Sequence, residues 1–230
     1  MLCNSLQSCV FVIAKLSVQV SLIVMLTKLE EKGDKGKSKR KAEKYWPELN
    51  QSRLMFPRSH IRVEQLPHKR SEQGGYVYRK FLVTRGSNIG TIVHQLQATA
   101  WPDHSVPETP QLVLDLVSEA NMLSPSVTAP LLVHCSAGVG RTGTFIAAHK
   151  LSRDLERSVD SLEVARTVVE MRKCRMKMVQ TADQYVHIYR CLQELYNQRE
   201  EDDEYDDEDY GDYGDYYSYS NSYYENESIV

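Results

Sequence analysis

Cysteine is scarce in this sequence, with five residues in 230, and the five are scattered along the chain. An odd number of scattered cysteines argues against the disulfide framework that holds many small secreted domains together. Metal-ligand spacing is also lacking, because Cys3 and Cys9 have no second pair of ligands and His60, His68 and His94 fit no metal-binding motif. We therefore expect no metal and no other cofactor.

Long apolar runs are lacking as well. The apolar residues from Val10 to Ala14 are followed at once by Lys15 and further polar residues, so the run is too short to span a bilayer. No basic residue precedes it, which argues against a signal peptide. The alternating residues from Leu16 to Leu22 and the apolar run to Leu26 favour strands instead. A chain of this length is expected to form one domain with a substantial core.

Positive charge is absent from the end of the chain. Residues 200–230 hold 13 of the 31 acidic residues and eight of the 14 tyrosines, but no lysine or arginine. So little aliphatic surface cannot offset the loss of chain entropy, and we expect this acidic, tyrosine-rich tail to be disordered. The tail could simply solubilise the protein, or it could act as a phosphorylation or docking segment that contacts the body of the same chain.

The body of the chain is correspondingly basic. Residues 1–199 contain all 28 lysines and arginines but only the other 18 acidic residues, which gives a net charge of +10. A basic surface suits an anionic substrate, and nucleic acid is the alternative partner. No nucleic-acid-binding motif accompanies the charge, so we expect no nucleic acid to bind.

The residues that indicate chemistry lie between Leu131 and Phe145, in the stretch LLVHCSAGVGRTGTF. Its apolar start predicts a buried strand, its small residues predict a loop, and a helical pattern begins at about Thr142. The backbone N–H groups of such a loop converge on one point, where the helix dipole also favours negative charge. The stretch therefore predicts an anion-binding loop.

The side chains of this loop suit a phosphate and a nucleophile. Gly138 and Gly140 permit positive φ and the close approach of a ligand, and Arg141 carries a forked guanidinium that suits two phosphate oxygens. Cys135 lies at the centre of the loop, at the N-terminus of a helix, where a thiolate nucleophile is favoured. An ordinary buried cysteine would leave the arginine and the glycines unexplained, and the G-x-x-x-x-G-K-S/T pattern of nucleotide-binding loops is absent. A cysteine-dependent phosphatase is favoured.

Three stretches resemble motifs of the classical protein tyrosine phosphatases. HCSAGVGRTGTF is similar to the signature loop of that family, Trp101-Pro102-Asp103 to its mobile acid loop, and Val179 to Tyr185 to its glutamine loop. The similarity runs from about Val20 to Gln198. It implies an α/β fold, a twisted mixed β-sheet flanked by helices, with the signature loop between a strand and a helix N-terminus. Residues 20–199 would form a catalytic domain that lacks its N-terminal part, preceded by a divergent segment, residues 1–19.

The resemblance also implies an activity, the hydrolysis of phosphotyrosine in proteins. Cys135 would attack phosphorus and form a cysteinyl-phosphate intermediate, while Asp103 would protonate the leaving phenolate and later help to activate water. The phosphate oxygens would be held by Arg141 and by the backbone of the signature loop, which comprises Ser136, Ala137, Gly138, Val139, Gly140 and Arg141.

Further residues would support this chemistry. By resemblance, Gln180 would position the attacking water with the help of Gln184, and His134 would orient the loop. Thr142 could donate its hydroxyl to the cysteine sulfur and ease its departure. The charged segment from residue 28 to residue 44 reads by itself as a solvated loop, but it resembles the lysine- and glutamate-bearing loop beside the active site of the family. Glu31 and Lys41 would fill those two roles.

Two alternatives to a tyrosine phosphatase are open. A dual-specificity phosphatase is the nearer one, and a non-catalytic phosphotyrosine-binding or decoy module is suggested by the lack of the N-terminal part. A catalytic thiolate requires a reducing compartment, so we expect the chain in the cytoplasm, or at the cytoplasmic face of a membrane if it belongs to a receptor.

The remaining elements are predicted from hydrophobic periodicity. Alternating patterns predict strands over His60–Leu66, Tyr76–Arg85 and Ile92–Thr99. Helical spacing predicts a helix from Thr142 to about Leu155, and another whose apolar face is Leu162, Ala165 and Val169. A last helix is expected to be capped by Thr181 together with Gln184.

Overall fold

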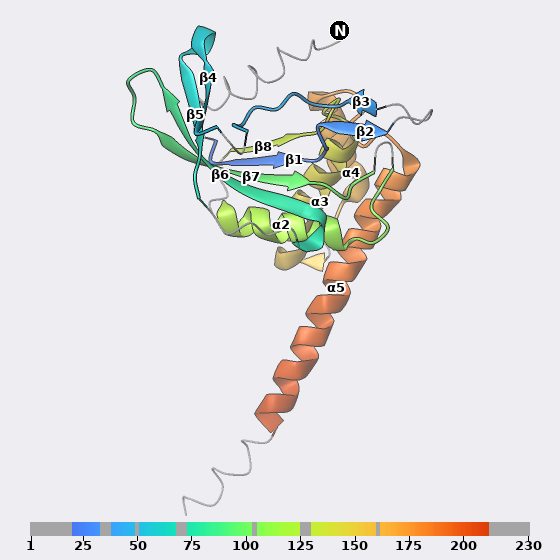
Figure 1. The fold of residues 1–230 in the computed structure, drawn as a ribbon. Coiled ribbons are helices and arrows are strands. Elements are labelled where there is room, and N and C mark those ends of the chain that lie inside the picture. The colour runs from blue at the N-terminus through green and yellow to red at the C-terminus, as the bar shows by residue number, and fades with distance from the viewer. Residues whose placement is uncertain are drawn as a thin grey trace, which may run out of the picture. The chain divides into compact units, whose positions relative to one another are not determined.

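The structure is a computed structural model, and it describes residues 20–32, 38–48, 51–67, 73–102, 105–124, 130–159 and 162–211. The chain divides into two compact units, Met1–Leu192 and Gln193–Val230. The first unit contains all of the strands, which Figure 1 labels. The strands are β1 (Leu22–Met25), β2 (Glu30–Lys32), β3 (Ser38–Arg40), β4 (Arg53–Phe56), β5 (Ile61–Gln65), β6 (Tyr76–Arg85), β7 (Thr91–Ala98) and β8 (Leu131–His134). The α-helices are α2 (Gln111–Leu123), α3 (Gly140–Arg157), α4 (Val164–Cys174) and α5 (Ala182–Gly211), and the short 3-10 helices are Pro57–Ser59 and Gln73–Gly75.

Six strands form one mixed sheet in the order β4-β5-β6-β7-β1-β8. The strands from β4 to β7 form an antiparallel meander, and β5, β6 and β7 confirm the three predicted strands to within one residue at each end. β1 lies between β7 and β8 and runs parallel to both. All four residues of β1 are apolar and buried, as is typical of a parallel strand that is covered on both faces.

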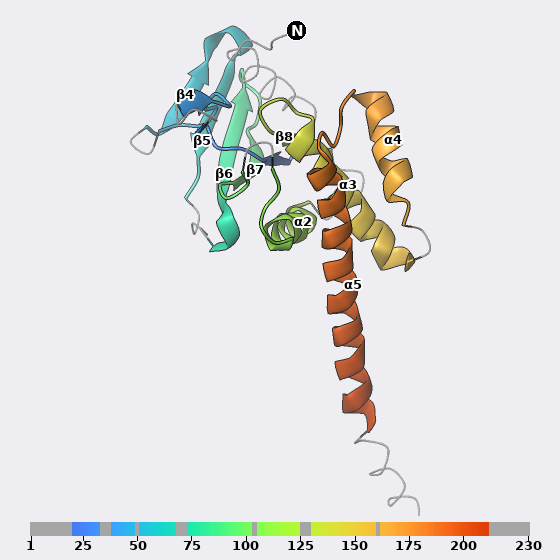
Figure 2. The same ribbon diagram turned by 90° about the vertical axis from the view of Figure 1, so that its right-hand side faces the viewer.

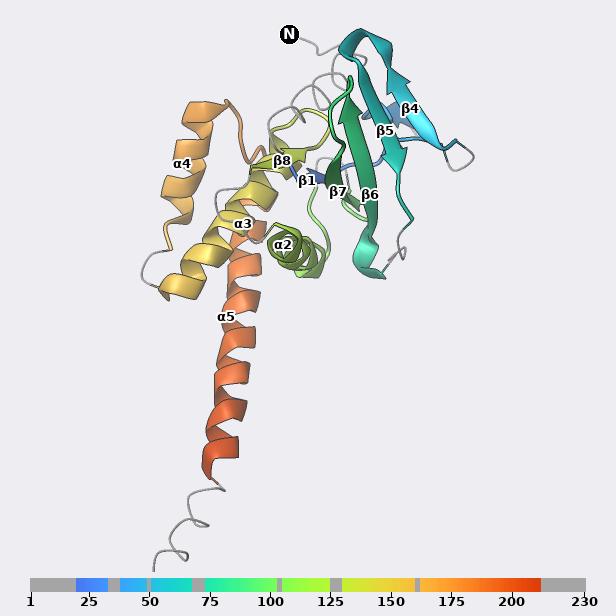
Figure 3. The same ribbon diagram turned by 90° about the vertical axis from the view of Figure 1, so that its left-hand side faces the viewer.

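The two faces of the sheet are covered differently. Figures 2 and 3 show α2 and α3 along one face, where α2 contacts β1 and β7 and α3 contacts β8. On the opposite face, Tyr45 and Trp46 pack on Ile23, Phe81 and Val93. The predicted mixed sheet flanked by helices is confirmed, and in the described part of the chain the segment 41–48 covers the face that these two helices leave open.

The buried face of α4 differs from the prediction. Ala165 and Val169 are exposed, whereas Val164, Thr167 and Val168 are buried. Apolar residues occur at helical spacing on both sets of positions, so periodicity could not choose between the two faces. The position of α3 decides which face of α4 is buried, because Val164 and Val168 pack on Ala147 and Leu151 of α3.

Helix α5 continues to Gly211, although we predicted disorder from residue 200 onwards. Over residues 200–211 the structure therefore differs from that prediction. Extending an existing helix needs no new nucleation, and the glutamates of this stretch are good helix formers. Residues 212–230 lie outside the described residues, and the contact of the tail with the body stays a prediction. Among the helices that the structure describes, none has the length and apolarity that a membrane crossing needs.

His149 makes the stability of the fold sensitive to acid. Its Nε2 lies 3.0 Å from Asn121 Oδ1, and its ring stacks on Phe145 at a centroid distance of 5.8 Å, so it links α2 to α3. Burial, together with the charge of Arg153, lowers the pKa of His149 to about 4. The unfolded chain binds this proton below a pH of about 6.5, whereas the folded chain binds it only below a pH of about 4.

We therefore expect the free energy of unfolding to fall by about 1–2 kcal/mol between pH 7 and pH 5 because of His149 alone. The substitution His149→Gln keeps a donor for Asn121 but removes the titration, so the variant should lose less stability over this range. Urea unfolding at several pH values would measure the difference. Parallel pH profiles for the two proteins would contradict this assignment.

Candidate active site

The sheet brings three distant segments of the chain together. The last residue of β1, Met25, is in register with Gln97 of β7 and with His134 of β8, and the backbone N–H of Leu26 donates to the carbonyl of His134 at 2.7 Å. The carboxyl ends of parallel strands meet at one edge of a sheet, where ligands of α/β proteins bind. The segments that follow β1, β7 and β8 carry Glu31, Trp101 and Cys135, so the topology explains why these three residues converge.

The predicted loop lies between β8 and α3, as expected from the sequence. The sulfur of Cys135 accepts a hydrogen bond from the backbone N–H of Gly138 at 3.3 Å and one from the Thr142 hydroxyl at 3.2 Å. Gly138 has a φ of 70°, which residues with a side chain rarely adopt. Two donors thus point at the sulfur beside the N-terminus of α3, where negative charge is favoured.

The other buried cysteine of the described residues has a different environment. Cys191 lies on α5 and is fully buried, and this burial raises the pKa of its thiol to about 12. Cys191 therefore remains a thiol at any physiological pH, and it serves as packing. Cys174, at the end of α4, is exposed and far along the chain from the predicted loop.

Arg141 is held by a buried carboxylate. Its Nη1 lies 2.7 Å from Glu31 Oε1 and its Nη2 lies 3.1 Å from Glu31 Oε2, a bidentate pair in which the two side chains are only 4% and 8% exposed. Nη1 also donates to the carbonyl of Trp101 at 3.2 Å. The guanidinium is thereby oriented from two sides, by the segment after β1 and by the segment after β7.

Glu31 in turn is fixed by its own neighbours. Its Oε1 accepts hydrogen bonds from the Thr27 hydroxyl at 3.0 Å and from the backbone N–H of Lys28 at 3.4 Å, and Lys41 Nζ lies 3.9 Å from its Oε2. Burial acts to raise the pKa of the carboxyl, but the hydrogen bonds and charge of Arg141, together with the bonds from Thr27 and Lys28, lower it overall. Glu31 is therefore ionised at neutral pH.

In its described residues, 28–32 and 38–44, the charged segment differs from the solvated loop that its composition predicts. Its residues form a two-stranded antiparallel ribbon, β2 and β3, in which Glu31 lies opposite Lys39. Beyond β3, the backbone N–H of Lys41 donates to the carbonyl of Leu29 at 2.8 Å. The structure thus places Glu31 on Arg141 and Lys41 beside Glu31, while the roles that the resemblance implies for them stay predictions.

A cavity of about 180 Å³ opens between these elements. It is lined by Lys39, Lys41, Cys135, Ser136, Ala137, Gly140, Arg141, Gln180 and Gln184. Most of the predicted site residues therefore share one cavity, and Thr142 adjoins it through its bond to the sulfur. Asp103 lies outside the described residues, and its role stays a prediction.

Gln184 connects the predicted glutamine loop to the start of α5. Its Oε1 accepts from the backbone N–H groups of Gln180 at 2.9 Å and of Thr181 at 3.4 Å, while its own backbone N–H donates to the Thr181 hydroxyl at 3.2 Å. These reciprocal bonds are a capping box, which confirms the predicted cap of this helix. Gln184 is only 2% exposed, so its main observed contribution is to hold the backbone that carries Gln180.

Close backbone packing joins the glutamine loop to the signature loop. Val179 has a φ of 58°, a left-handed conformation that is strained for a β-branched residue. Its N–H donates to the carbonyl of Val139 at 3.1 Å. A Cβ on Gly143 would lie 2.5 Å from the nitrogen of Val179, so only glycine allows α3 to approach this turn so closely.

Two arginines that sequence analysis missed hold these loops. Arg172 donates from Nε to the carbonyl of Met178 at 2.9 Å and from Nη2 to that of Val179 at 2.8 Å. Arg175 Nη2 donates to the carbonyl of Ala137 at 3.0 Å. Arg172 lies in the last turn of α4 and Arg175 directly follows the helix. Both bind main-chain oxygens, and no sequence pattern signals such a contact.

His134 lies in a chain of buried polar groups behind Cys135. Its Nε2 lies 2.9 Å from the Tyr45 hydroxyl and its Nδ1 lies 3.3 Å from the carbonyl of Cys135. The Tyr45 hydroxyl also accepts from Gln95 Nε2 at 2.7 Å, and Arg79 Nη1 donates to Gln95 Oε1 at 2.9 Å. Burial lowers the pKa of His134, which disfavours proton uptake by the ring. This environment suits the predicted role of orienting the loop better than the role of a base.

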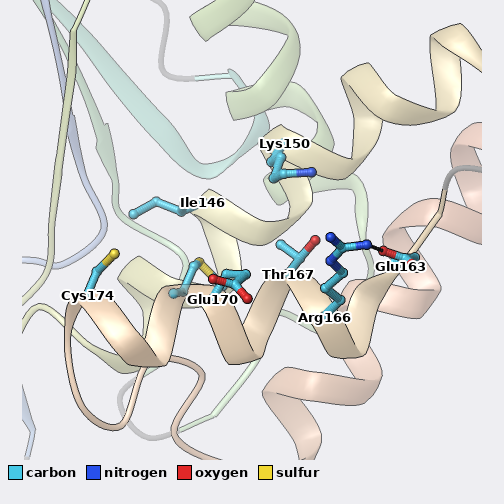
Figure 4. Close-up of a pocket in the computed structure, with 8 residues that line it drawn as sticks. Ile146, Lys150, Glu163, Arg166, Thr167, Glu170 and Cys174 are labelled. Carbon is cyan, nitrogen blue, oxygen red and sulfur yellow. Dashed lines mark hydrogen bonds and ion pairs between the residues drawn. The ribbon is translucent and has the colours of Figure 1, made fainter.

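A larger cavity lies between α3 and α4 and has a volume of about 480 Å³ (Figure 4). It is lined by Ile146, Lys150, Glu163, Arg166, Thr167, Glu170, Met171 and Cys174. Arg166 and Glu163 form an ion pair at 2.9 Å on its rim. The cavity shares no lining residue with the one at Cys135, so the larger volume does not coincide with the predicted chemistry.

The pairing of Glu31 with Arg141 can be tested through stability. We expect Glu31→Gln to lower the free energy of unfolding at pH 7 by about 2 kcal/mol, because a buried guanidinium loses its charged partner while one acceptor remains. Since the folded-state pKa of Glu31 is lowered, its contribution is present above a pH of about 4.3 and is lost as the pH falls through the folded-state pKa. The gap between variant and wild type should therefore narrow in acid.

Glu30→Gln provides the matched control for this measurement. Glu30 neighbours Glu31 on β2, but its carboxylate accepts from the exposed Ser38 hydroxyl at 2.9 Å. Surface changes of this kind are usually worth less than about 0.5 kcal/mol. Equal losses for the two variants in urea unfolding would show that the buried pair with Arg141 is not the source of the stability.

The chain matches the family model described as Protein-tyrosine phosphatase over residues 12–194. It is 36% identical over 182 residues to human receptor-type tyrosine-protein phosphatase C, which covers 78% of this chain and 13% of that protein. It is 37% identical over 185 residues to chicken receptor-type tyrosine-protein phosphatase eta, with coverage of 78% and 12%. The chain therefore spans only a small part of the length of these relatives.

Solved structures agree with the sequence comparisons. A protein tyrosine phosphatase of Trypanosoma brucei superposes with a TM-score of 0.68 at 37% identity, and the catalytic domain of human protein tyrosine phosphatase non-receptor type 18 with a TM-score of 0.70 at 29% identity. In both comparisons the match covers 79% of this chain and 63% of the solved chain. With the family model matching most of its length, this chain belongs to the protein-tyrosine phosphatase family.

Proposed function

We propose that this chain hydrolyses phosphotyrosine in proteins through a cysteinyl-phosphate intermediate. The observation that supports the proposal most is the environment of Cys135, whose sulfur accepts hydrogen bonds from Gly138 and Thr142 in a cavity that Arg141 also lines. Such a cavity offers a nucleophile and phosphate-binding donors at one point.

In the first step, the thiolate of Cys135 attacks phosphorus, the S–P bond forms and the bond from phosphorus to the phenolic oxygen breaks. Asp103 gives its proton to the leaving phenolate. Arg141 and the backbone N–H groups from Ser136 to Arg141 stabilise the charge on the equatorial oxygens. Because Glu31 already holds the guanidinium, little reorganisation is needed when the phosphate enters.

In the second step, water attacks phosphorus and the S–P bond breaks, which restores the thiolate and releases phosphate. The carboxylate of Asp103 accepts a proton from this water, and Gln180 orients it with the help of Gln184. The hydroxyl of Thr142, 3.2 Å from the sulfur, stabilises the departing thiolate. Each proton that Asp103 donates in the first step is thus returned in the second.

The proposed partners are phosphotyrosine-containing proteins, and the proposed location is the cytoplasm or the cytoplasmic face of a membrane. The reduced thiol that the mechanism requires supports a reducing compartment. Receptor-type phosphatases among the relatives support the second location.

The test compares the purified chain with Cys135→Ser and Asp103→Ala on a phosphotyrosyl peptide and on a small aryl phosphate. We expect Cys135→Ser to lose activity at least about 10³-fold while phosphate binding survives, since a hydroxyl stays protonated. Asp103→Ala should lower kcat by about 10²–10⁴-fold and change binding little, because the proton is needed in the transition state. Cys174→Ser, which removes an exposed thiol of α4, is the matched control and should keep the wild-type rate.

Other outcomes separate the alternatives. Tight binding of the phosphopeptide by the wild type without any turnover would identify a phosphotyrosine-binding or decoy module. Equal kcat/KM on phosphothreonyl and phosphotyrosyl peptides would identify a dual-specificity phosphatase. Full activity of Cys135→Ser would refute the cysteinyl-phosphate route.

A further inference from the structure

The ribbon of β2 and β3 presents one face to the Cys135 cavity. Glu31 and Lys39 are directly opposite each other in the antiparallel register, so their side chains lie on the same face of the ribbon. Glu31 binds Arg141 on that face, and both Lys39 and Lys41 line the cavity. The alternate residue, Arg40, pairs with Glu43.

The cations that line this cavity differ in their partners. Arg141 is paired with Glu31 at 2.7 Å, and the ammonium of Lys41 lies 3.9 Å from the same carboxylate. Lys39 is exposed, and among the residues that the structure describes no carboxylate lies within ion-pair distance of it. With respect to these described residues, its ammonium is available to a group that enters from outside.

The position of Lys39 suits a second anionic group of a substrate better than the phosphate itself. The N–H of Gly138 points at the sulfur, next to which the phosphate must lie for attack, and Arg141 lines the same cavity. Lys39 belongs to an exposed strand of the ribbon, at the border of the same cavity. A flexible lysine ammonium at the border of a cavity can bind a negatively charged group of the substrate that lies outside the deep, phosphate-binding part of the cavity.

We propose that Lys39 is a specificity-determining residue that binds the carboxylate of an aspartate or glutamate adjacent to the phosphotyrosine of the substrate. The inference rests on the proposed phosphatase function and adds a preference for acidic sequence around the phosphorylated residue. The contact is exposed to water, so it contributes a modest selectivity that salt screens.

The experiment uses three phosphotyrosyl peptides that differ only in the flanking residue, with glutamate on the N-terminal side, glutamate on the C-terminal side, or alanine on both. The wild type should prefer one glutamate peptide over the alanine peptide by about two- to fivefold in kcat/KM. Lys39→Ala should bring this ratio close to one, mainly through a higher KM, and Lys39→Glu should invert it. In about 0.5 M salt the wild-type preference should shrink.

Arg40→Ala is the matched control, because it removes the same charge from the adjacent residue of β3. It should keep the wild-type ratio. If the kcat/KM ratio fell equally in Arg40→Ala, the effect would be a general one of charge and the proposal would be overturned.

An unchanged kcat/KM ratio in Lys39→Ala would overturn the proposal as well. So would an equal loss of kcat/KM on all three peptides, because Lys39 would then serve the phosphate or the proton-transfer step.

Binding keeps this test separate from the test of catalysis. In the Cys135→Ser background, calorimetry measures the dissociation constants of the same three peptides, with and without Lys39→Ala. The same two- to fivefold preference, lost with Lys39, is expected there. If the wild type binds these peptides without turnover, the proposed catalysis fails, but the dissociation constants still decide the role of Lys39. Equal affinities for all three peptides would refute the role of Lys39 alone.

Discussion

The parallel pairing of β1 with both β7 and β8 is the constraint on which the site depends. It aligns Met25 with Gln97 and His134, so the three segments that follow these strands leave the sheet at one edge. A slip by one residue would exchange the side chains that β1 presents to its two faces, which are both buried but packed against different elements. The burial of a four-residue strand thus sets the distance between Glu31, Trp101 and Cys135, which lie far apart in the sequence.

Buried polar groups then orient the side chains of the candidate site within that frame. On the face that Trp46 covers, Arg79 lies 4.6 Å from the Trp46 ring and donates to Gln95, which leads through Tyr45 to His134. On the other side of the cavity, Thr27 holds Glu31 and Glu31 holds Arg141. Buried polar groups are costly when they lack partners, so each chain of bonds specifies one arrangement of its members. The rigidity of the site follows from this requirement.

The loops around the cavity are held in conformations that they would not adopt alone. Val179 keeps a strained left-handed backbone because its N–H is bound by Val139 and its carbonyl by Arg172. Arg175 binds the signature loop itself, at the carbonyl of Ala137. Backbone strain of this kind persists only where the surrounding structure over-determines it, and it is frequent at functional sites. Helix α4 therefore contributes to the site although none of its residues lines the Cys135 cavity.

Most features that were predicted correctly from the sequence have a local sequence pattern. The strand–loop–helix around Cys135, the strands β5 to β7 and the capping box of Thr181 and Gln184 each have a sequence pattern of a few consecutive residues, so the sequence alone predicted them. The buried face of α4 could not be predicted, because two sets of apolar positions had the same spacing and only the packing on α3 distinguished them. The helix over residues 200–211 was missed because the composition shows only that this stretch has too few apolar residues to form a core. It does not show whether a preceding helix continues into the stretch.

The contacts among the site residues were decided by the tertiary structure. Glu31 was placed near the active site only by its resemblance to a family motif, and the bidentate pair with Arg141 spans 110 residues of sequence. The roles of Tyr45, Arg172 and Arg175 were invisible for the same reason, since each binds a partner in another element. The sequence by itself determined which local elements form and which loop could bind a phosphate. The parallel register of β1 decided which charged side chains surround that loop, because only long-range packing brings the ends of three strands together.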